Sequence, residues 1–207
     1  MKRFALALAA VMSTLVVAFP AQAAPAETFH FSFKGQFAEA FFTSTDPSGC
    51  IQTDVFVFAV DGKLKQDGAP AVESSASVAI SQFDVCTGTG LLDAFGSATL
   101  EPAEFVIDNK LTSATLDTTV TVMDFVSGTT FPVDVAVSWT GTGATFRVKE
   151  HSQIKTPGFK LNSRFDGTFR DAAASGTVSD GTTNFTPEPA AFADMGSVKS
   201  GEVSIVH

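Results

Sequence analysis

Apolar and polar residues alternate along most of the chain after residue 28. The clearest example is the run 131–139, in which the large apolar residues occupy every second position. Its large apolar members are Phe131, Val133, Val135, Val137 and Trp139. Shorter runs of the same kind cover residues 29–34, 72–81 and 116–122. A period of two predicts β-strands with one buried face.

Short turn signals separate these runs, among them Asp61-Gly62, Asp67-Gly68 and Pro157-Gly158. Such pairs suit tight turns because glycine adopts a positive φ at no steric cost and proline has a fixed φ. No segment has a convincing helical period. We therefore predict an all-β fold. The expected architecture is an antiparallel two-sheet β-sandwich of about ten to twelve strands, and a closed β-barrel is the alternative.

The first 23 residues have the three parts of a secretory signal peptide. Two basic residues are followed by a mainly apolar run, and Ala21-Gln22-Ala23 is a small-x-small cleavage site. The apolar run is shorter than the roughly 20 residues of a membrane-spanning helix. We predict a cleavable signal peptide, Met1–Ala23, and one domain, residues 24–207. The domain is expected to be secreted or periplasmic, with no membrane span after cleavage.

The chain has two cysteines, Cys50 and Cys86, and both follow the predicted signal peptide. An even number of cysteines in an exported protein favours a disulfide. The three histidines, His30, His151 and His207, lie far apart in the sequence, so a zinc site with four ligands is not indicated. We predict a Cys50–Cys86 disulfide that ties two loops at one end of the sheets, and no metal or cofactor.

Without Lys2 and Arg3, the 13 basic side chains of the chain fall to 11, against 22 acidic ones. A negative field of this size repels nucleic acids, so we expect no nucleic-acid partner. The aromatic residues are 21 Phe, one Trp and no Tyr. Because Phe has no polar group, we expect most of these rings in the hydrophobic core.

Basic residues are concentrated in one segment. Residues 147–170 hold six of them against two acids, whereas residues 27–146 hold four against 15 acids. If the segment folds as a hairpin about Pro157-Gly158, side-chain alternation places basic residues on one face. This candidate anion-binding patch consists of Arg147, Lys149, His151, Lys160 and Arg164. The plainer interpretation is a solvated face whose charges pair with acids such as Asp166.

Common catalytic motifs are absent from the sequence, including Gly-x-Ser-x-Gly, His-Glu-x-x-His and the phosphate-binding Gly-x-x-x-x-Gly-Lys-Ser/Thr. We therefore expect a non-enzymatic exported protein with a binding or structural role outside the cytoplasm and an unknown ligand. An anionic ligand at the 147–164 hairpin is the one partner that the sequence suggests. Two alternatives stay open: a secreted hydrolase that uses dispersed carboxylates, and a β-barrel that binds a small apolar ligand.

Overall fold

The structure is a computed structural model that describes residues 28–206, without the side chains of residues 71–73 and 206. The described residues form ten β-strands and no helix, which confirms the predicted all-β fold and the predicted number of strands. A helix with the length and apolarity needed to cross a membrane is absent from this part of the chain. The predicted signal peptide, Met1–Ala23, lies outside the described residues.

All strand pairings are antiparallel. The strands are β1 (Thr28–Thr45), β2 (Ile51–Gln66), β3 (Ala69–Asp84), β4 (Thr89–Thr99), β5 (Phe105–Ile107), β6 (Ser113–Asp124), β7 (Thr130–Gly141), β8 (Phe146–Thr156), β9 (Phe159–Ser179) and β10 (Phe192–Val206). Their order in the sheet is β10-β1-β2-β3-β4-β6-β7-β9-β8, with β5 paired to β6. Because β9 also pairs with β10, all strands except β5 and β8 close a ring. The strands therefore belong to one connected antiparallel sheet.

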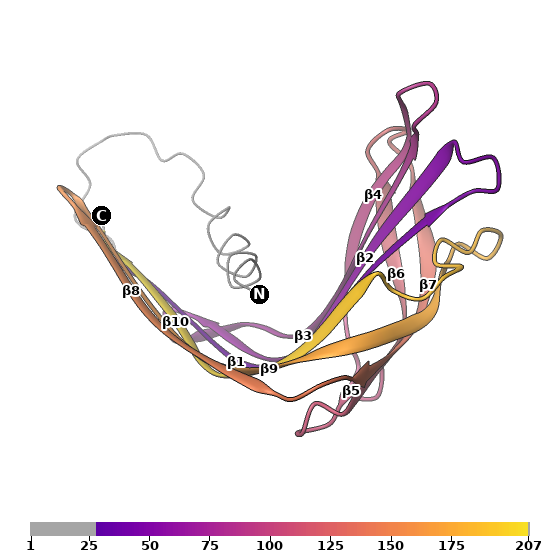
Figure 1. Ribbon diagram of the computed structural model, residues 1–207. Coiled ribbons are helices and arrows are strands. Elements are labelled where there is room, and N and C mark those ends of the chain that lie inside the picture. Colours follow the sequence, from indigo (N-terminus) through magenta and orange to yellow (C-terminus); the bar gives the residue numbers. More distant parts are fainter. Residues whose placement is uncertain (1–27, 207) are drawn as a thin grey trace.

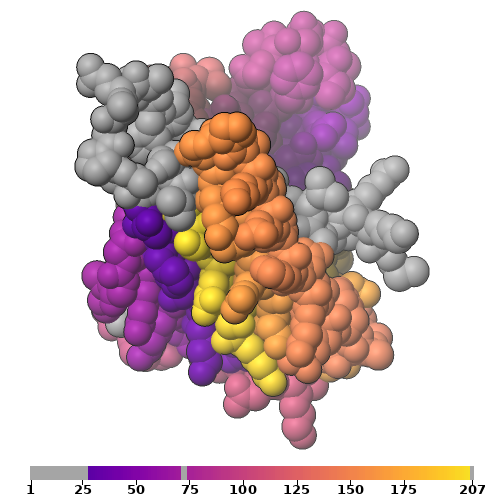
Figure 2. Space-filling model, turned by 90° about the vertical axis from the view of Figure 1, so that its left-hand side faces the viewer, coloured from indigo at the N-terminus to yellow at the C-terminus, as the bar shows by residue number. Residues whose placement is uncertain are grey.

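The sheet has a second, open part beyond the ring. The long strands β1, β2, β9 and β10 bend as they leave the ring and continue side by side (Figure 1). We call this open part the wing; it consists of residues 28–36, 61–70, 146–156, 159–169 and 197–206. Figure 2 views the wing from its outer side, where its strands lie next to one another. The bend gives the wing a concave inner side and a convex outer side (Figure 1).

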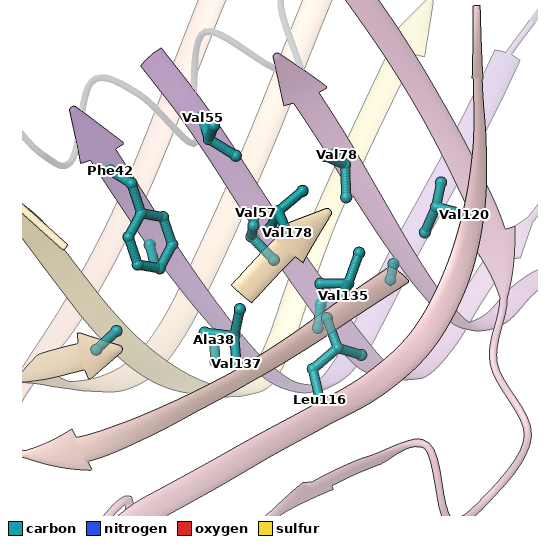
Figure 3. Close-up of a cluster of buried hydrophobic side chains, with 14 of the residues drawn as sticks. Ala38, Phe42, Val55, Val57, Val78, Leu116, Val120, Val135, Val137 and Val178 are labelled. Carbon is teal, nitrogen blue, oxygen red and sulfur yellow. The ribbon is translucent and has the colours of Figure 1, made fainter. Parts of the chain in front are cut away.

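The hydrophobic core fills the inside of the ring. Val55, Val57 and Val78 on one wall face Leu116 and Val135 on the other (Figure 3), and all five are at most 1% exposed. The predicted alternation of residues 131–139 is confirmed from Val133 to Trp139, since the alternate apolar residues are buried and those between them are exposed. The period-two pattern of the sequence therefore determines which side chains pack inside the ring.

Most phenylalanines lie outside this core, which corrects the expectation from composition. Only Phe37, Phe42, Phe105 and Phe185 are buried among the described residues, and Phe37 lies on the outer surface of the ring wall. Phe37 Cζ is 2.5 Å from the position that a Cβ of Gly196 would take. The Phe37 ring therefore occupies the space beside Gly196 that a side chain at that position would otherwise take.

The predicted disulfide joins Cys50 and Cys86, whose Cα atoms are 5.3 Å apart. Cys50 immediately precedes β2 and Cys86 follows β3, and these neighbouring strands place Ile51 opposite Asp84. The bond therefore ties two loops at one end of the sheet, as expected. A structural disulfide is consistent with an oxidising compartment.

Candidate anion-binding face

The predicted hairpin is formed by β8 and the first half of β9, which pair without a register shift. Pro157-Gly158 makes the turn, and Gly158 has a φ of 77°. His151 lies opposite Arg164. On β8, Arg147 and Lys149 are an even number of residues from His151. On β9, Lys160 is an even number of residues from Arg164. All five predicted patch residues therefore share one face of the hairpin.

Asp166 neutralises one end of this patch. Its carboxylate accepts hydrogen bonds from Arg147 Nε at 2.8 Å and Nη2 at 2.6 Å, and Lys149 Nζ lies 3.8 Å away. The hydrogen bond from Arg147, together with the charges of Arg147, Lys149 and Lys199, holds the pKa of Asp166 below its ordinary value. The pairing expected in the plainer interpretation is thus present for two patch residues. Among the described side chains, no carboxylate lies within 4.0 Å of a basic nitrogen of Lys160 or Arg164.

The sheet brings further cations to the same side of the wing. One register line crosses five strands and contains Lys65, Ser32, Glu202, Arg164 and His151. Residues in register share a side of an antiparallel sheet, so Lys65 lies on the side of the hairpin patch. Lys34 and Lys63 are each two residues from a member of this line and point to the same side. Sequence reasoning missed these lysines because it could not show which strands pair.

We call this side of the wing the basic face. The register places eight of the 11 Lys and Arg residues that follow the predicted signal peptide on it: Lys34, Lys63, Lys65, Arg147, Lys149, Lys155, Lys160 and Arg164. We count Lys199 as the ninth, because its charge acts on Asp166 although it has no register partner at the β10 bulge. Its strands contribute three carboxylates to the same side, Asp61, Asp166 and Glu202. The face therefore carries a positive excess on a chain that is acidic overall.

Two pairs of lysines lie directly opposite each other on the basic face. Lys34 is the register partner of Lys63, and Lys155 is the partner of Lys160. Like charges at directly opposite positions destabilise an antiparallel sheet. An acidic residue at one position of each pair would remove the repulsion, and an anion bound from outside would have the same effect.

A shallow hollow of about 410 Å³ lies at the hairpin end of the basic face. It is lined by Lys149, Glu150, His151, Arg164, Phe165, Asp166 and Ser200. With neighbouring strands about 4.8 Å apart, the face is about 19 Å wide from β2 to β8. An open surface of this width suits an extended anion better than a small enclosed one.

A second group of titratable residues lies at the bend, on the opposite side of the sheet. Glu39 on β1 is the register partner of Asp194 on β10, which is itself opposite Asp171 on β9. Burial, together with the charge of Glu39, raises the pKa of Asp194 to about 7, and burial also raises the pKa of Glu39. Asp194 Oδ1 is buried without a hydrogen-bond partner among the described residues. These acids belong to distant segments, so the sequence gives no signal that would find them.

Among the described residues, one further group of candidate metal ligands lies close together, and it does not offer a metal site. Cys50, Cys86 and Asp84 are close together, but the two sulfur atoms are bonded to each other and offer no thiolate. The backbone N–H of His30 donates to Asp67 at 2.8 Å, at the far end of the wing. His207 lies outside the described residues.

No family model and no curated protein matches this chain. The chemistry of the basic face therefore rests on its own residues, their spacing and their charge.

Proposed function

We propose that this is an exported, non-enzymatic protein that binds an extended anionic polymer on the basic face of its wing. The observation that carries the proposal is the concentration of nine of 11 cationic side chains on one side of five adjacent strands. Basic residues that served only to solvate the surface would have no reason to gather on one side of the sheet. Arginine and lysine at regular spacing supply donors for sulfate, carboxylate or phosphate groups along a chain.

The opposed lysines Lys34–Lys63 and Lys155–Lys160 support an external anion over internal pairing. Neither pair has a carboxylate within 4.0 Å of its Nζ atoms among the described side chains. In the unbound protein the two lysines of each pair repel each other. An anionic group placed between them removes this repulsion, which makes the free energy of binding more favourable.

Chromatography on immobilised dextran sulfate tests the proposal. An acidic protein is repelled by this matrix unless a local positive surface outweighs its net charge. We expect residues 24–207 to be retained at low salt and to elute as the salt concentration rises. Arg164→Ala should weaken binding to dextran sulfate at least about tenfold, the loss of about one charged hydrogen bond.

Lys110→Ala is the matched control, because it removes one positive charge from a residue outside the wing. Its elution should coincide with that of the unchanged protein. If both variants elute earlier by the same amount, net charge governs retention and the basic face is not a binding site. Failure of the unchanged protein to bind at low salt would also end the proposal.

A secreted hydrolase is the second candidate. The observation that favours it is the Glu39–Asp194 pair, since an acid that keeps its proton near neutral pH beside a second carboxyl group is a common arrangement for acid–base catalysis. Release of reducing ends from a panel of acidic and neutral polysaccharides measures this activity. Activity that is lost in Asp194→Asn would support the hydrolase, and no release from any polysaccharide in the panel would count against it.

A further inference from the structure

The outer edge of β8 is an open sheet edge. β8 is the last strand in the sheet order and pairs only with β9. In the part of the chain that the structure describes, no backbone hydrogen bond joins residues 146–156 to any other segment. All of its residues except Val148 are exposed. An edge of 11 residues without a bulge or an internal proline is a template for a further strand.

The hairpin turn determines which residues direct backbone groups to this edge. Thr156 and Phe159 flank the two-residue turn and pair with each other. The residues beside such a turn exchange their hydrogen bonds, and every second residue from there does the same. The intervening residues therefore direct their N–H and C=O groups outward: Arg147, Lys149, His151, Gln153 and Lys155.

These outward-bonding positions are also the ones whose side chains lie on the basic face. The other side of β8 presents two of the exposed large apolar side chains of the molecule, Phe146 and Ile154, each 51% exposed. A strand that adds to this edge would meet cations and Gln153 on one side, and exposed apolar side chains together with Glu150 on the other. Its complement is a segment in which acidic residues alternate with apolar or β-branched ones.

A second copy of the chain fits this edge poorly. Antiparallel self-pairing about His151 would place Arg147 opposite Lys155 on each side of the centre. A shift that centres the pairing on Glu150 would place this residue against itself and Lys149 against His151. Basic residues on an edge strand oppose self-association in this way, while they attract an acidic strand.

We propose that the outer edge of β8 receives an extended acidic segment of another protein by strand addition. The partner's backbone pairs with the outward N–H and C=O groups, and its carboxylates at alternate positions meet Arg147, Lys149 and Lys155. This mode of recognition takes affinity from main-chain hydrogen bonds and specificity from alternate side chains. It goes beyond the polymer binding proposed above, because it requires the free backbone of one strand in addition to positive charge.

The test uses residues 24–207 and two peptides of 11 residues, the length of β8. In one peptide, Thr and Glu alternate; the control has the same composition with all Glu residues in one block. We expect the alternating peptide to bind at least tenfold more tightly. Its binding should slow hydrogen exchange at the outward amides of Lys149, His151 and Gln153.

Gln153→Pro removes one outward N–H without changing the charge, and the bonds of its neighbours to β9 stay in place. Gln153→Ala is its control, since both variants lose the side-chain bond to Asn162 Oδ1 and only the proline variant loses the amide. The proline variant should bind the alternating peptide at least tenfold more weakly than the alanine variant, with equal binding of dextran sulfate. Weaker dextran sulfate binding in Arg164→Ala then reports separately on the proposed function.

Equal affinity for the two peptides would overturn strand addition, because charge alone would then explain binding. So would an unchanged exchange rate at the outward amides when the alternating peptide is bound. The exchange measurement uses the unchanged protein, so it decides the question even if Gln153→Pro disturbs the hairpin.

Discussion

Trp139 and Glu39 are joined by a hydrogen bond across the inside of the ring. The indole Nε1–H donates to the backbone carbonyl oxygen of Glu39 at 2.8 Å, and the indole is 1% exposed. β7 and β1, which carry these residues, are not neighbours in the sheet order. The bond therefore fixes two walls of the ring that no strand pairing connects.

Trp139→Phe should lower the free energy of unfolding by about 1–3 kcal/mol, because the variant leaves a buried carbonyl oxygen without its donor. Urea denaturation followed by circular dichroism measures the change. Phe42→Leu is the control, as it alters a buried side chain of the same core without removing a hydrogen bond, and it should cost less than about 1.5 kcal/mol. Equal losses in the two variants would mean that packing, and not the hydrogen bond, is what matters at Trp139.

Asp194→Asn should stabilise the protein at neutral pH. The folded-state pKa of Asp194, about 7, is above the value of 3.8 for a free carboxyl. Between these values the folded protein holds a proton that the unfolded chain has released, so stability falls as the pH rises through this window. Glu39 and Asp171 face Asp194 from the two neighbouring strands, and their charges add to the effect of burial.

The gain from Asp194→Asn should be near zero at pH 4 and reach about 2–4 kcal/mol at pH 8. Thermal unfolding at several pH values measures it. Asp117→Asn, a change at an exposed residue on β6, is the control and should show no comparable trend. A gain that does not depend on pH would contradict the assigned role of the Asp194 proton.

Local pattern was sufficient to predict the strands and the β8–β9 hairpin. The alternation from Val133 to Trp139 decides which side chains enter the core, and Pro157-Gly158 decides where the hairpin turns. The alternation lies within the strand that it predicts, and the Pro-Gly pair lies within the turn that it predicts. The hairpin part of the basic face followed from them directly.

Pairing between distant strands was beyond the reach of this pattern. Lys34 and Lys63 join the basic face through the β1–β2 register and the pairings of β1 and β9 with β10, none of which a period of two specifies. For the same reason, the sequence pattern does not predict that β9 pairs with β10 and closes the ring. The position of Phe37 depends on Gly196, a residue of another strand, so composition wrongly assigned such rings to the core.

Loss of the disulfide should lower the free energy of unfolding by about 4 kcal/mol, the chain-entropy value for a loop of this size. Cys50 and Cys86 are separated by 36 positions. Guanidinium denaturation of the unchanged protein and of Cys50→Ala/Cys86→Ala measures the difference. Addition of a reductant should lower the midpoint of the unchanged protein and leave that of the double variant where it is. A midpoint of the unchanged protein that does not respond to reductant would show that the bond contributes little.

Gly196→Ala should destabilise the bend, because a Cβ at this position would lie 2.5 Å from Phe37 Cζ and 3.2 Å from Phe169 Cδ1. Phe37 is 3% exposed and cannot swing into solvent without losing its packing, so we expect a loss of about 1–3 kcal/mol in urea denaturation. Gly90→Ala is the control, since a Cβ there meets no atom within 4 Å. Phe37→Leu in the Gly196→Ala background should recover part of the loss, because the smaller side chain leaves room for the methyl group. If the double variant is less stable than the sum of the two single changes, the ring is not what the methyl group displaces.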